Sequence, residues 1–312
     1  MADSSTTALV PVSDEDLRAC RDILAEGSKS FSAASWLLPA RARDPAAVFY
    51  AFCRVADDAV DDSGDPAGAV QMLRGRLDRI FAGAPDPDQV DRALSRVVAQ
   101  YELPRHVFDA LIDGFVWDAE GRDYDELSEV VGYSARVAST VGVIMTLLMG
   151  VRDRETLARA CDLGVAMQLT NIARDVGEDA RRGRIYLPGR WLEEAGVDRA
   201  ALLREPAFTP ELGSVVARLL AHADELYARA DQGIPRLPRD CRPAIRAARS
   251  IYSDIGRVIA AQGHDTVSSR AYTTKARKLW LLLGAWLGLG GARADGREAE
   301  PLPEVAFLLS PP

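Results

Sequence analysis

The chain has 312 residues, of which 48% are hydrophobic and 27% charged, a composition typical of a soluble globular protein with a sizeable core. The formal net charge of −8 argues against nucleic acid or an anionic membrane surface as the electrostatic partner. The cysteines (Cys20, Cys53, Cys161 and Cys241) show no C-x-x-C spacing and the histidines are dispersed, so neither a zinc site nor a disulfide framework is indicated.

Apolar residues recur at helical spacing between about residues 13 and 289, and alternating runs are rare. Ser13 with Asp16 predicts a helix start, and Asp44-Pro45 predicts an N-cap before a proline at the first position of a helix that stops at Ser63-Gly64. Further helices are predicted over 67–82, 88–101, 104–120, 125–149, 154–182, 210–232, 239–262 and 265–289. We therefore predict a single all-α domain over residues 1–312, with poorly ordered tails at 1–12 and 291–312.

Neither end of the chain predicts a membrane segment. The N-terminus lacks a basic region followed by an apolar core, so no signal peptide is expected and the predicted location is cytoplasmic. The most apolar run, Leu279 to Gly291, is shorter than the ~20 residues that span a bilayer. We interpret it as a core helix, with a membrane-contacting patch or a channel lid as the alternative.

Two pairs of aspartates, each spaced four residues apart, stand out within the predicted helices. Asp57 and Asp61 lie in Val-Ala-Asp-Asp-Ala-Val-Asp-Asp, and Asp175 and Asp179 lie in Arg-Asp-Val-Gly-Glu-Asp. Carboxylates at this spacing share one helix face, where they destabilise the helix by a few tenths of a kcal/mol. Mg²⁺ offsets such a cost, because it binds one or two protein carboxylates together with water and substrate phosphate oxygens. Two such faces predict a site that holds a diphosphate through bridging metals.

Each pair also extends a longer polar stripe on a helix whose other faces are apolar. The stripes consist of Tyr50, Arg54, Asp57 and Asp61 in the first helix and Gln168, Asn171, Asp175 and Asp179 in the second. A polar stripe among apolar residues is costly unless it is paired or metal-bound. A solvated charged face is the usual interpretation of one isolated pair, but two aligned stripes favour the metal. An EF-hand is excluded, because Ala59 and Gly68 stand where a calcium loop starting at Asp57 needs ligands.

Six segments of the chain resemble, in order and spacing, the squalene/phytoene synthase family. They are Ser28-Lys-Ser-Phe31, Tyr50-Ala-Phe-Cys-Arg-Val-Ala-Asp-Asp-Ala-Val-Asp61, Tyr133-Ser-Ala-Arg-Val-Ala-Ser-Thr-Val-Gly142, Gln168-Leu-Thr-Asn-Ile-Ala-Arg-Asp-Val-Gly-Glu-Asp179, Arg184-Ile-Tyr-Leu-Pro188 and Ser250-Ile-Tyr-Ser-Asp254. The resemblance runs from about residue 14 to 285 and is strongest to the bacterial, purple-bacterial members that make phytoene.

This resemblance implies an all-α isoprenoid synthase fold, a helical bundle around a central apolar cavity whose mouth lies between the two aspartate faces. It implies head-to-head condensation of two geranylgeranyl diphosphates to 15-cis-phytoene through prephytoene diphosphate, the first committed step of carotenoid biosynthesis. Several Mg²⁺ or Mn²⁺ ions bridging diphosphate are expected, and no NADPH. The chemistry agrees, because metals and arginines stabilise a leaving diphosphate and an apolar cavity keeps a carbocation from water.

The resemblance also implies roles for individual residues. Asp57, Asp61, Asn171, Asp175 and Asp179 would hold metal, and Tyr133 would assist proton removal or stabilise the cation. A phenol with a pKa near 10 is a poor base unless perturbed, so released diphosphate is an alternative proton acceptor. The expected diphosphate contacts are Ser28, Ser30, Phe31, Tyr50, Arg54, Gln168, Asn171, Arg174, Arg184, Tyr252 and Arg270.

Several alternatives stay open. Ser28 and Ser30 are otherwise a helix end, Tyr252 a core aromatic, and Asp58 and Asp62 either outer-sphere groups or exposed. The small residues of 137–142 provide either close helix packing or room for a prenyl chain. A dehydrosqualene or squalene synthase using farnesyl diphosphate is the nearest rival function, because cavity depth sets chain length. A non-catalytic relative would be expected to lack the metal ligands. The expected partners are prenyl diphosphates, without nucleic acid; contact with the inner membrane, a downstream desaturase and the oligomeric state are left open.

Overall fold

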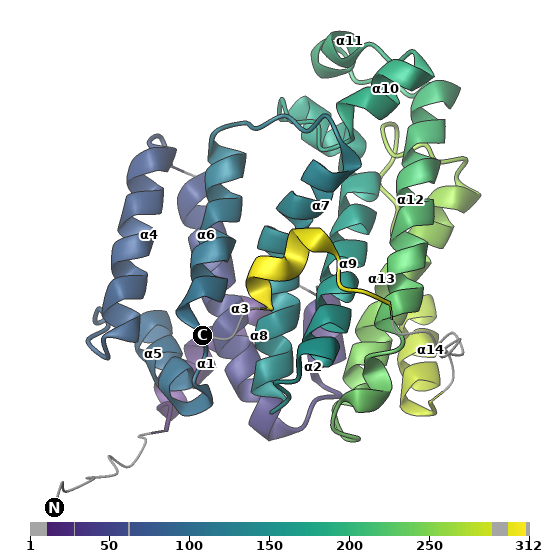
Figure 1. The fold of residues 1–312 in the computed structure, drawn as a ribbon. Coiled ribbons are helices and arrows are strands. Elements are labelled where there is room, and N and C mark those ends of the chain that lie inside the picture. Colours follow the sequence, from purple (N-terminus) through teal and green to yellow (C-terminus); the bar gives the residue numbers. More distant parts are fainter. Residues whose placement is uncertain (1–10, 28, 62, 289–298, 310–312) are drawn as a thin grey trace, which may run out of the picture.

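The computed structural model describes residues 11–27, 29–61, 63–288 and 299–309, with side chains except at 29–31 and 61. Every regular element in these ranges is helical, as predicted (Figure 1). The elements are α1 (Asp14–Gly27), α2 (Lys29–Ser35), α3 (Ala40–Asp61), α4 (Pro66–Phe81), α5 (Gln89–Tyr101), α6 (Arg105–Ala119), α7 (Leu127–Ser134), η1 (Ala135–Ser139), α8 (Thr140–Leu148), α9 (Arg154–Arg181), α10 (Gly189–Ala195), α11 (Arg199–Arg204), α12 (Pro210–Ala230), η2 (Ile234–Arg236), α13 (Arg242–Ala261), α14 (Lys275–Trp286) and η3 (Pro303–Leu308).

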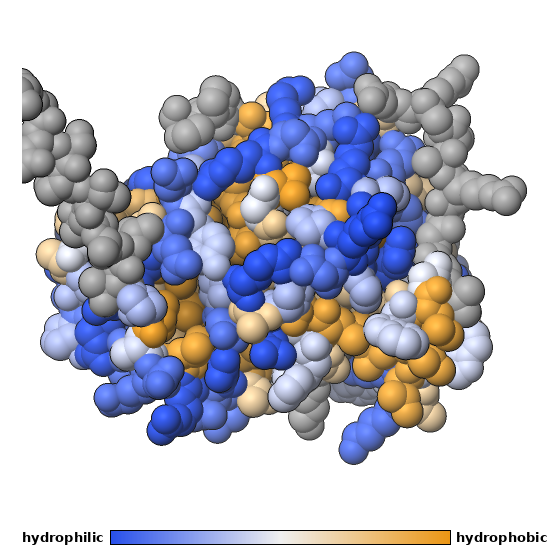
Figure 2. Space-filling view, turned by 90° about the horizontal axis from the view of Figure 1, so that it is seen from below, coloured by the Kyte–Doolittle hydropathy of each residue, from blue (hydrophilic) through white to orange (hydrophobic). Residues whose placement is uncertain are grey.

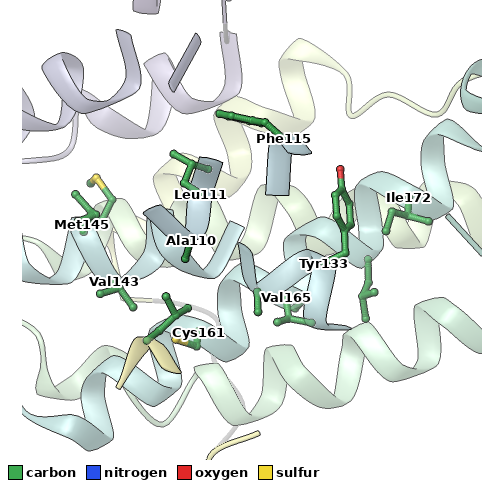
Figure 3. Packing of buried hydrophobic residues seen from close by; sticks show 14 of the residues in the cluster. Ala110, Leu111, Phe115, Tyr133, Val143, Met145, Cys161, Val165 and Ile172 are labelled. Carbon is green, nitrogen blue, oxygen red and sulfur yellow. The ribbon is translucent and has the colours of Figure 1, made fainter. Parts of the chain in front are cut away.

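The long helix α9 runs through the middle of the bundle, where it packs against α12, α8, η1 and α13. It begins because the Asp153 side chain accepts a hydrogen bond from the backbone N–H of Thr156 at 2.9 Å, an N-cap. Val165, Leu169 and Ile172 are buried on its apolar faces, and Figure 3 shows Val165 and Ile172 within the core. The predicted polar stripe therefore belongs to a helix that is held rigidly by its other faces.

Helix α3 begins earlier than predicted. It starts at Ala40 after Pro39, so Pro45 lies inside the helix and Asp44 is not its N-cap. A proline inside a helix leaves the carbonyl four residues earlier without its N–H donor. That carbonyl belongs to Arg41, and the Tyr101 hydroxyl of α5 donates a hydrogen bond to it at 2.7 Å. A tertiary contact thus replaces the missing backbone bond, which local sequence could not reveal.

Helices α7 and α8 form one continuous helix with a π-helical turn, η1, between them. The resulting helix Leu127–Leu148 is long and apolar enough to cross a membrane, but 72% of its most apolar window is buried inside the protein. This is the pattern of a core helix. A Cβ atom at Gly142 would lie 2.6 Å from the Ala160 carbonyl oxygen of α9, so the small residues of 137–142 do allow close packing.

The C-terminal region differs from expectation in three respects. Residues 265–274 do not join the predicted helix 265–289, because the Asp265 carboxylate accepts from the N–H groups of Val267 and Ser268 and forms a turn instead. Helix α14 buries only Ala285 and exposes most of its large apolar side chains, so it is not a core helix. Residues 299–309 of the expected disordered tail form a packed segment in which Val305 and Leu308 are buried.

Candidate active site

A cavity of about 310 Å³ lies between α3, α8, α9 and α13. Most of its lining is apolar. Phe49 and Cys53 of α3, Val141 and Met145 of α8, and Met167 of α9 are examples. The polar lining side chains are Tyr50, Gln168, Asn171, Tyr252, Thr146, Thr156 and Arg159. The cavity thus offers an apolar interior with polar groups at particular positions.

On α9, both amides of the predicted stripe face this cavity. Asn171 donates a hydrogen bond from Nδ2 to Oε1 of Gln168 at 3.3 Å, while its own Oδ1 is buried without a hydrogen-bond partner among the described residues. Asp175 and Asp179 follow one and two turns later on the same face of α9. The stripe therefore leads from the cavity to the pair of carboxylates.

Asp175 is gripped by two arginines. Arg174 donates to both of its carboxylate oxygens, at 2.8 and 2.6 Å, and Arg270 does the same at 2.7 and 3.0 Å. Arg270 also lies 3.2 Å from Glu178. Arg270 reaches this position because its loop packs directly on α9: a Cβ atom at Gly177 would lie 2.6 Å from Cα of Val267. The glycine of Arg-Asp-Val-Gly-Glu-Asp thus permits the loop to close over the carboxylates.

The Asp179 carboxyl is buried beside other negative charges. Burial first, and then the charges of Asp175 and Glu178, raise its pKa to about 7, while Arg182 and Arg184 oppose this shift. The backbone N–H of Arg184 donates to the Asp179 carbonyl at 2.8 Å, so Arg184 lies at the end of the same helix. A bound cation would relieve the repulsion at this carboxyl.

The stripe of α3 approaches the cavity from another side. Tyr50 and Cys53 line the cavity, and the Asp57 charge contributes to the raised pKa of the Cys53 thiol, after burial. Arg54 forms an ion pair of 2.7 Å with Asp58 and lies 3.8 Å from Asp57. Asp58 is half-exposed, and its carboxylate pairs with Arg54 on the surface of α3. The Asp61 side chain lies outside the described residues.

Tyr252 of α13 completes the polar end of the cavity. Burial raises its pKa, Arg174 lowers it, and Asp175 raises it, which places the phenol near both charged groups. Of the expected diphosphate contacts, Tyr50, Gln168, Asn171 and Tyr252 thus line one cavity, while Arg174 and Arg270 meet at Asp175. Ser28 and the side chains of Ser30 and Phe31 lie outside the described residues.

Tyr133 does not line the cavity. Its hydroxyl donates to Oδ2 of Asp118 at 2.9 Å, and the Tyr186 hydroxyl donates to Oδ1 of the same carboxylate at 2.7 Å. The Tyr133 and Tyr186 rings stack with centroids 5.1 Å apart. Burial, followed by the Asp118 charge, raises the pKa of Tyr133 well above 10, which makes the phenol a still poorer base. Tyr133 is thus a hydrogen-bond donor to Asp118 in this structure, an arrangement that disfavours its role as a proton acceptor; its role in stabilising the cation stays a prediction.

The donor groups fit a hard divalent cation. No cluster of three or more His, Cys, Asp or Glu side chains suited to a metal occurs among the described residues, which leave out the Asp61 side chain. Two observations support the fit: the buried Asn171 Oδ1 has no described hydrogen-bond partner, and the Asp179 carboxyl is crowded by negative charge. Amide and carboxylate oxygens are the ligands that Mg²⁺ accepts.

Sequence reasoning missed two polar residues of this region, Asp118 and Arg159. Asp118 joins two tyrosine hydroxyls, and nothing in its local sequence indicates this role. Arg159 lines the cavity at the start of α9. Its position did carry a signal, because it lies on the same helical face as Leu163, Met167 and Asn171.

An all-helical fold whose apolar cavity leads to paired aspartates and converging arginines defines a prenyl diphosphate-coupling synthase. The chain belongs to the squalene/phytoene synthase family, whose sequence model matches residues 24–277.

It is 50% identical over 305 residues to a phytoene synthase of Rhodobacter capsulatus, covering 96% of this chain and 90% of the relative. A phytoene synthase of Cereibacter sphaeroides is 49% identical over 318 residues, covering 96% and 88%. Among solved structures, a dehydrosqualene synthase with bound ligand superposes with a TM-score of 0.81 at 30% identity, covering 88% of this chain and 96% of that one. A squalene synthase from Alicyclobacillus acidocaldarius gives a TM-score of 0.75 at 27% identity, covering 80% and 95%.

Proposed function

We propose that this protein joins two molecules of geranylgeranyl diphosphate head to head, through prephytoene diphosphate, to form phytoene. One observation carries the proposal: an apolar cavity reaches Asn171 on α9, and Asp175 and Asp179 follow one and two turns later on the same face of that helix. Such a site suits a substrate with a long hydrocarbon tail and a diphosphate head. The relatives named phytoene synthases, which match nearly the whole chain, support geranylgeranyl diphosphate over farnesyl diphosphate.

In this proposal the arginines hold the departing diphosphate. Arg174 and Arg270 already converge at Asp175, and Arg54 lies beside Asp57. Each guanidinium can bind phosphate oxygens through two parallel N–H groups. Arg184, at the end of the Asp179 helix, would add positive charge on the same side. Magnesium or manganese held by Asp57, Asp61, Asn171, Asp175 and Asp179 would supply further stabilisation of the charge on the leaving group.

The cavity wall would protect the carbocation that remains when diphosphate leaves. Val141, Met145 and Met167 present hydrocarbon and sulfur but no water-binding group to the interior. Tyr252 and Tyr50 would bring the only phenol rings of the described lining near the diphosphate end. Because Tyr133 stays protonated on Asp118, the final proton would pass to another acceptor, for which released diphosphate is the candidate.

The proposal is tested by product analysis. Purified protein with Mg²⁺ is given geranylgeranyl or farnesyl diphosphate, each with and without NADPH, and the extract is analysed by mass spectrometry. We expect phytoene from geranylgeranyl diphosphate without NADPH. A thirty-carbon product formed in preference from farnesyl diphosphate would instead identify a dehydrosqualene or squalene synthase, the two being distinguished by the effect of NADPH on product mass.

We also propose that the protein binds a lipid bilayer at the surface of the inner membrane through α14. Leu279, Trp280, Leu283, Trp286 and Leu287 recur at helical spacing on one face and are each 53–69% exposed. Figure 2 shows apolar side chains gathered on the right of the face, at the position of α14. Lys275 precedes this face, and tryptophan beside lysine suits the interface between lipid and water. An enzyme bound to the bilayer could release its hydrocarbon product directly into the lipid.

Co-sedimentation with phosphatidylglycerol-containing vesicles tests this contact. The double variant Leu279→Glu, Leu283→Glu should lose most binding, because it places charge on the apolar face. Met72→Glu on α4, where Met72 is 45% exposed, is the matched control and should bind as the wild type does. Equal binding by all three proteins would exclude α14 as the contact. Binding to other proteins in place of vesicles would point to a protein partner such as a desaturase.

A further inference from the structure

The cavity has a second polar region, formed by Thr156 and Arg159 at the beginning of α9. Both residues are 2% exposed, and both line the cavity. The Thr156 hydroxyl and the Nη1 group of Arg159 have no hydrogen-bond partner within the described ranges. Buried polar groups are nearly always hydrogen-bonded to protein or water. Thr156 and Arg159 therefore place a buried hydroxyl and a buried guanidinium, both incompletely hydrogen-bonded, at the wall of a mostly apolar cavity.

The remaining contacts of Arg159 hold it in place. Its Nη2 donates to the Ala299 carbonyl oxygen at 2.8 Å, and its Nε lies 3.2 Å from Oδ2 of Asp162. Its Cβ atom would be only 2.5 Å from a Cβ added at Gly233, so α9 and the chain after α12 are tightly packed here. Arg159 cannot withdraw from the cavity without breaking these contacts.

Arg159 helps to hold the C-terminal segment, residues 299–309, in place, but this contact does not by itself explain why an arginine lies at the cavity. Arg229 of α12 makes equivalent contacts: it donates to Oδ2 of the same Asp162 at 3.2 Å and to the Glu300 carbonyl at 2.6 Å. Arg229 is not among the residues that line the cavity. The two arginines share the structural contacts, and only Arg159 adds a charged group to the cavity wall.

Arg159 lies far from the diphosphate end of the cavity. The lining residues of α9 follow one face of the helix in the order Thr156, Arg159, Leu163, Met167 and Asn171. At 1.5 Å per residue, Arg159 is about 24 Å along the axis from Asp175 and about 18 Å from Asn171. A prenyl chain whose diphosphate binds near Asp175 and whose tail follows this face would point its end toward Arg159.

We propose that Thr156 and Arg159 form the end wall for the prenyl chain and thereby limit the length of substrate that the cavity accepts. This inference rests on the proposed coupling of prenyl diphosphates. A longer tail would have to press hydrocarbon against the guanidinium and the hydroxyl, which hydrocarbon cannot hydrogen-bond. A site that leaves buried polar groups unpaired discriminates strongly against the ligand that does so.

The test compares two substrates in competition, twenty-carbon geranylgeranyl diphosphate and twenty-five-carbon geranylfarnesyl diphosphate. Two variants remove the polar groups: Thr156→Val does so with little change in shape, and Arg159→Met also shortens the side chain. Each should raise the ratio of kcat/KM for the longer over the shorter substrate, Arg159→Met by at least about tenfold. The kcat/KM for geranylgeranyl diphosphate is measured in the same reactions, so that the ratio separates a change in chain-length selectivity from a general loss of activity.

Arg229→Met is the matched control. It removes the same kind of contacts to Asp162 and to the C-terminal segment without changing the cavity wall, so the substrate ratio should equal that of the wild type. An equal rise in Arg229→Met and Arg159→Met would assign the effect to loosening of the C-terminal segment and overturn the inference. Thermal melting is measured for all variants, and Thr156→Val decides the question if Arg159→Met does not fold.

The outcomes separate this inference from the proposed function. If the wild type couples geranylgeranyl diphosphate but neither variant changes the substrate ratio, the end wall is excluded and the function stands. A wild type that already uses the twenty-five-carbon substrate equally well also overturns the inference. If the wild type couples neither substrate, the proposed function itself fails.

Discussion

Arg270 and Asp175, 95 residues apart in the chain, form a two-point ion pair with N–O distances of 2.7 and 3.0 Å. Arg270 comes from an irregular loop and Asp175 from the central helix α9. Because Arg174 binds the same carboxylate, two guanidinium groups stand side by side at the point where the proposed diphosphate would arrive. Arginines that are already positioned need little reorganisation to bind phosphate oxygens.

Replacing Arg270 by lysine tests this arrangement. Lysine keeps the charge but cannot form two parallel hydrogen bonds, so Arg270→Lys should raise KM for geranylgeranyl diphosphate by about tenfold. Steady-state kinetics at saturating Mg²⁺ measures the change. Arg218→Lys, at an exposed ion pair of 2.7 Å with Glu194, is the control and should leave KM unchanged. An unchanged KM in Arg270→Lys would remove Arg270 from the diphosphate site.

The proposed metal ligands are tested by Asp57→Asn and Asp175→Asn. Each substitution removes one negative charge while keeping the size of the side chain, so turnover should fall by at least about a hundredfold. Circular dichroism should show an intact helical fold. Asp113→Asn, which removes the carboxylate partner of Arg74 at an exposed ion pair of 2.9 Å, should keep wild-type turnover. Wild-type activity in Asp57→Asn or Asp175→Asn would show that the metal assignment is wrong.

The raised pKa of Asp179 predicts that the stability of the metal-free protein depends on pH. Its pKa is raised to about 7, mainly by burial, whereas an unfolded aspartate has a pKa of about 3.9. A raised pKa means that the folded state holds the proton more tightly, so this stabilisation is present below pH ~4 and is lost as the pH rises through ~7. In EDTA, Asp179→Asn should therefore raise Tm at pH 8 by at least about 2 °C and lessen the fall in Tm between pH 5 and pH 8.

Differential scanning calorimetry at the two pH values gives this comparison. Asp113→Asn serves again as the control, because its carboxylate is half-exposed. If Tm fell equally in Asp179→Asn and in the wild type between pH 5 and pH 8, the negative charge around Asp179 would not affect stability in solution.

The variant Tyr133→Phe distinguishes two roles of Tyr133, a catalytic base and a structural hydrogen-bond donor. The substitution removes the Tyr133 hydroxyl that donates to Asp118, so the free energy of unfolding should fall by about 1.5–3 kcal/mol, the value of a hydrogen bond to a charged group. Turnover should fall by less than about tenfold, since loss of a general base costs roughly a hundredfold or more. Urea unfolding and single-turnover kinetics measure the two quantities. A loss of a hundredfold with unchanged stability would restore Tyr133 as the proton acceptor.

The sequence by itself identified the candidate groups of the site. The aspartates of α3 and α9 and the amides of Gln168 and Asn171 were identifiable because helical periodicity is local: residues three and four apart share a face whatever surrounds them. The same periodicity predicted α4, α5, α6, the helix 127–148, α9, α12 and α13 within a few residues, but not the short helices α10 and α11. The Ser13 cap was also readable, since its hydrogen bond is made within one turn.

Only the tertiary structure decided which groups face each other. The Tyr101 hydroxyl supplies a donor to the Arg41 carbonyl in α3, the loop at 265–274 packs on Gly177, and Tyr133 donates to Asp118 and does not line the cavity. The tertiary structure likewise decided that the apolar side chains of α14 face outward and that the helical face of Arg159 lines the cavity. These features arise from contacts between residues far apart in the chain, and the free energy of such contacts is set by the packing of the whole fold.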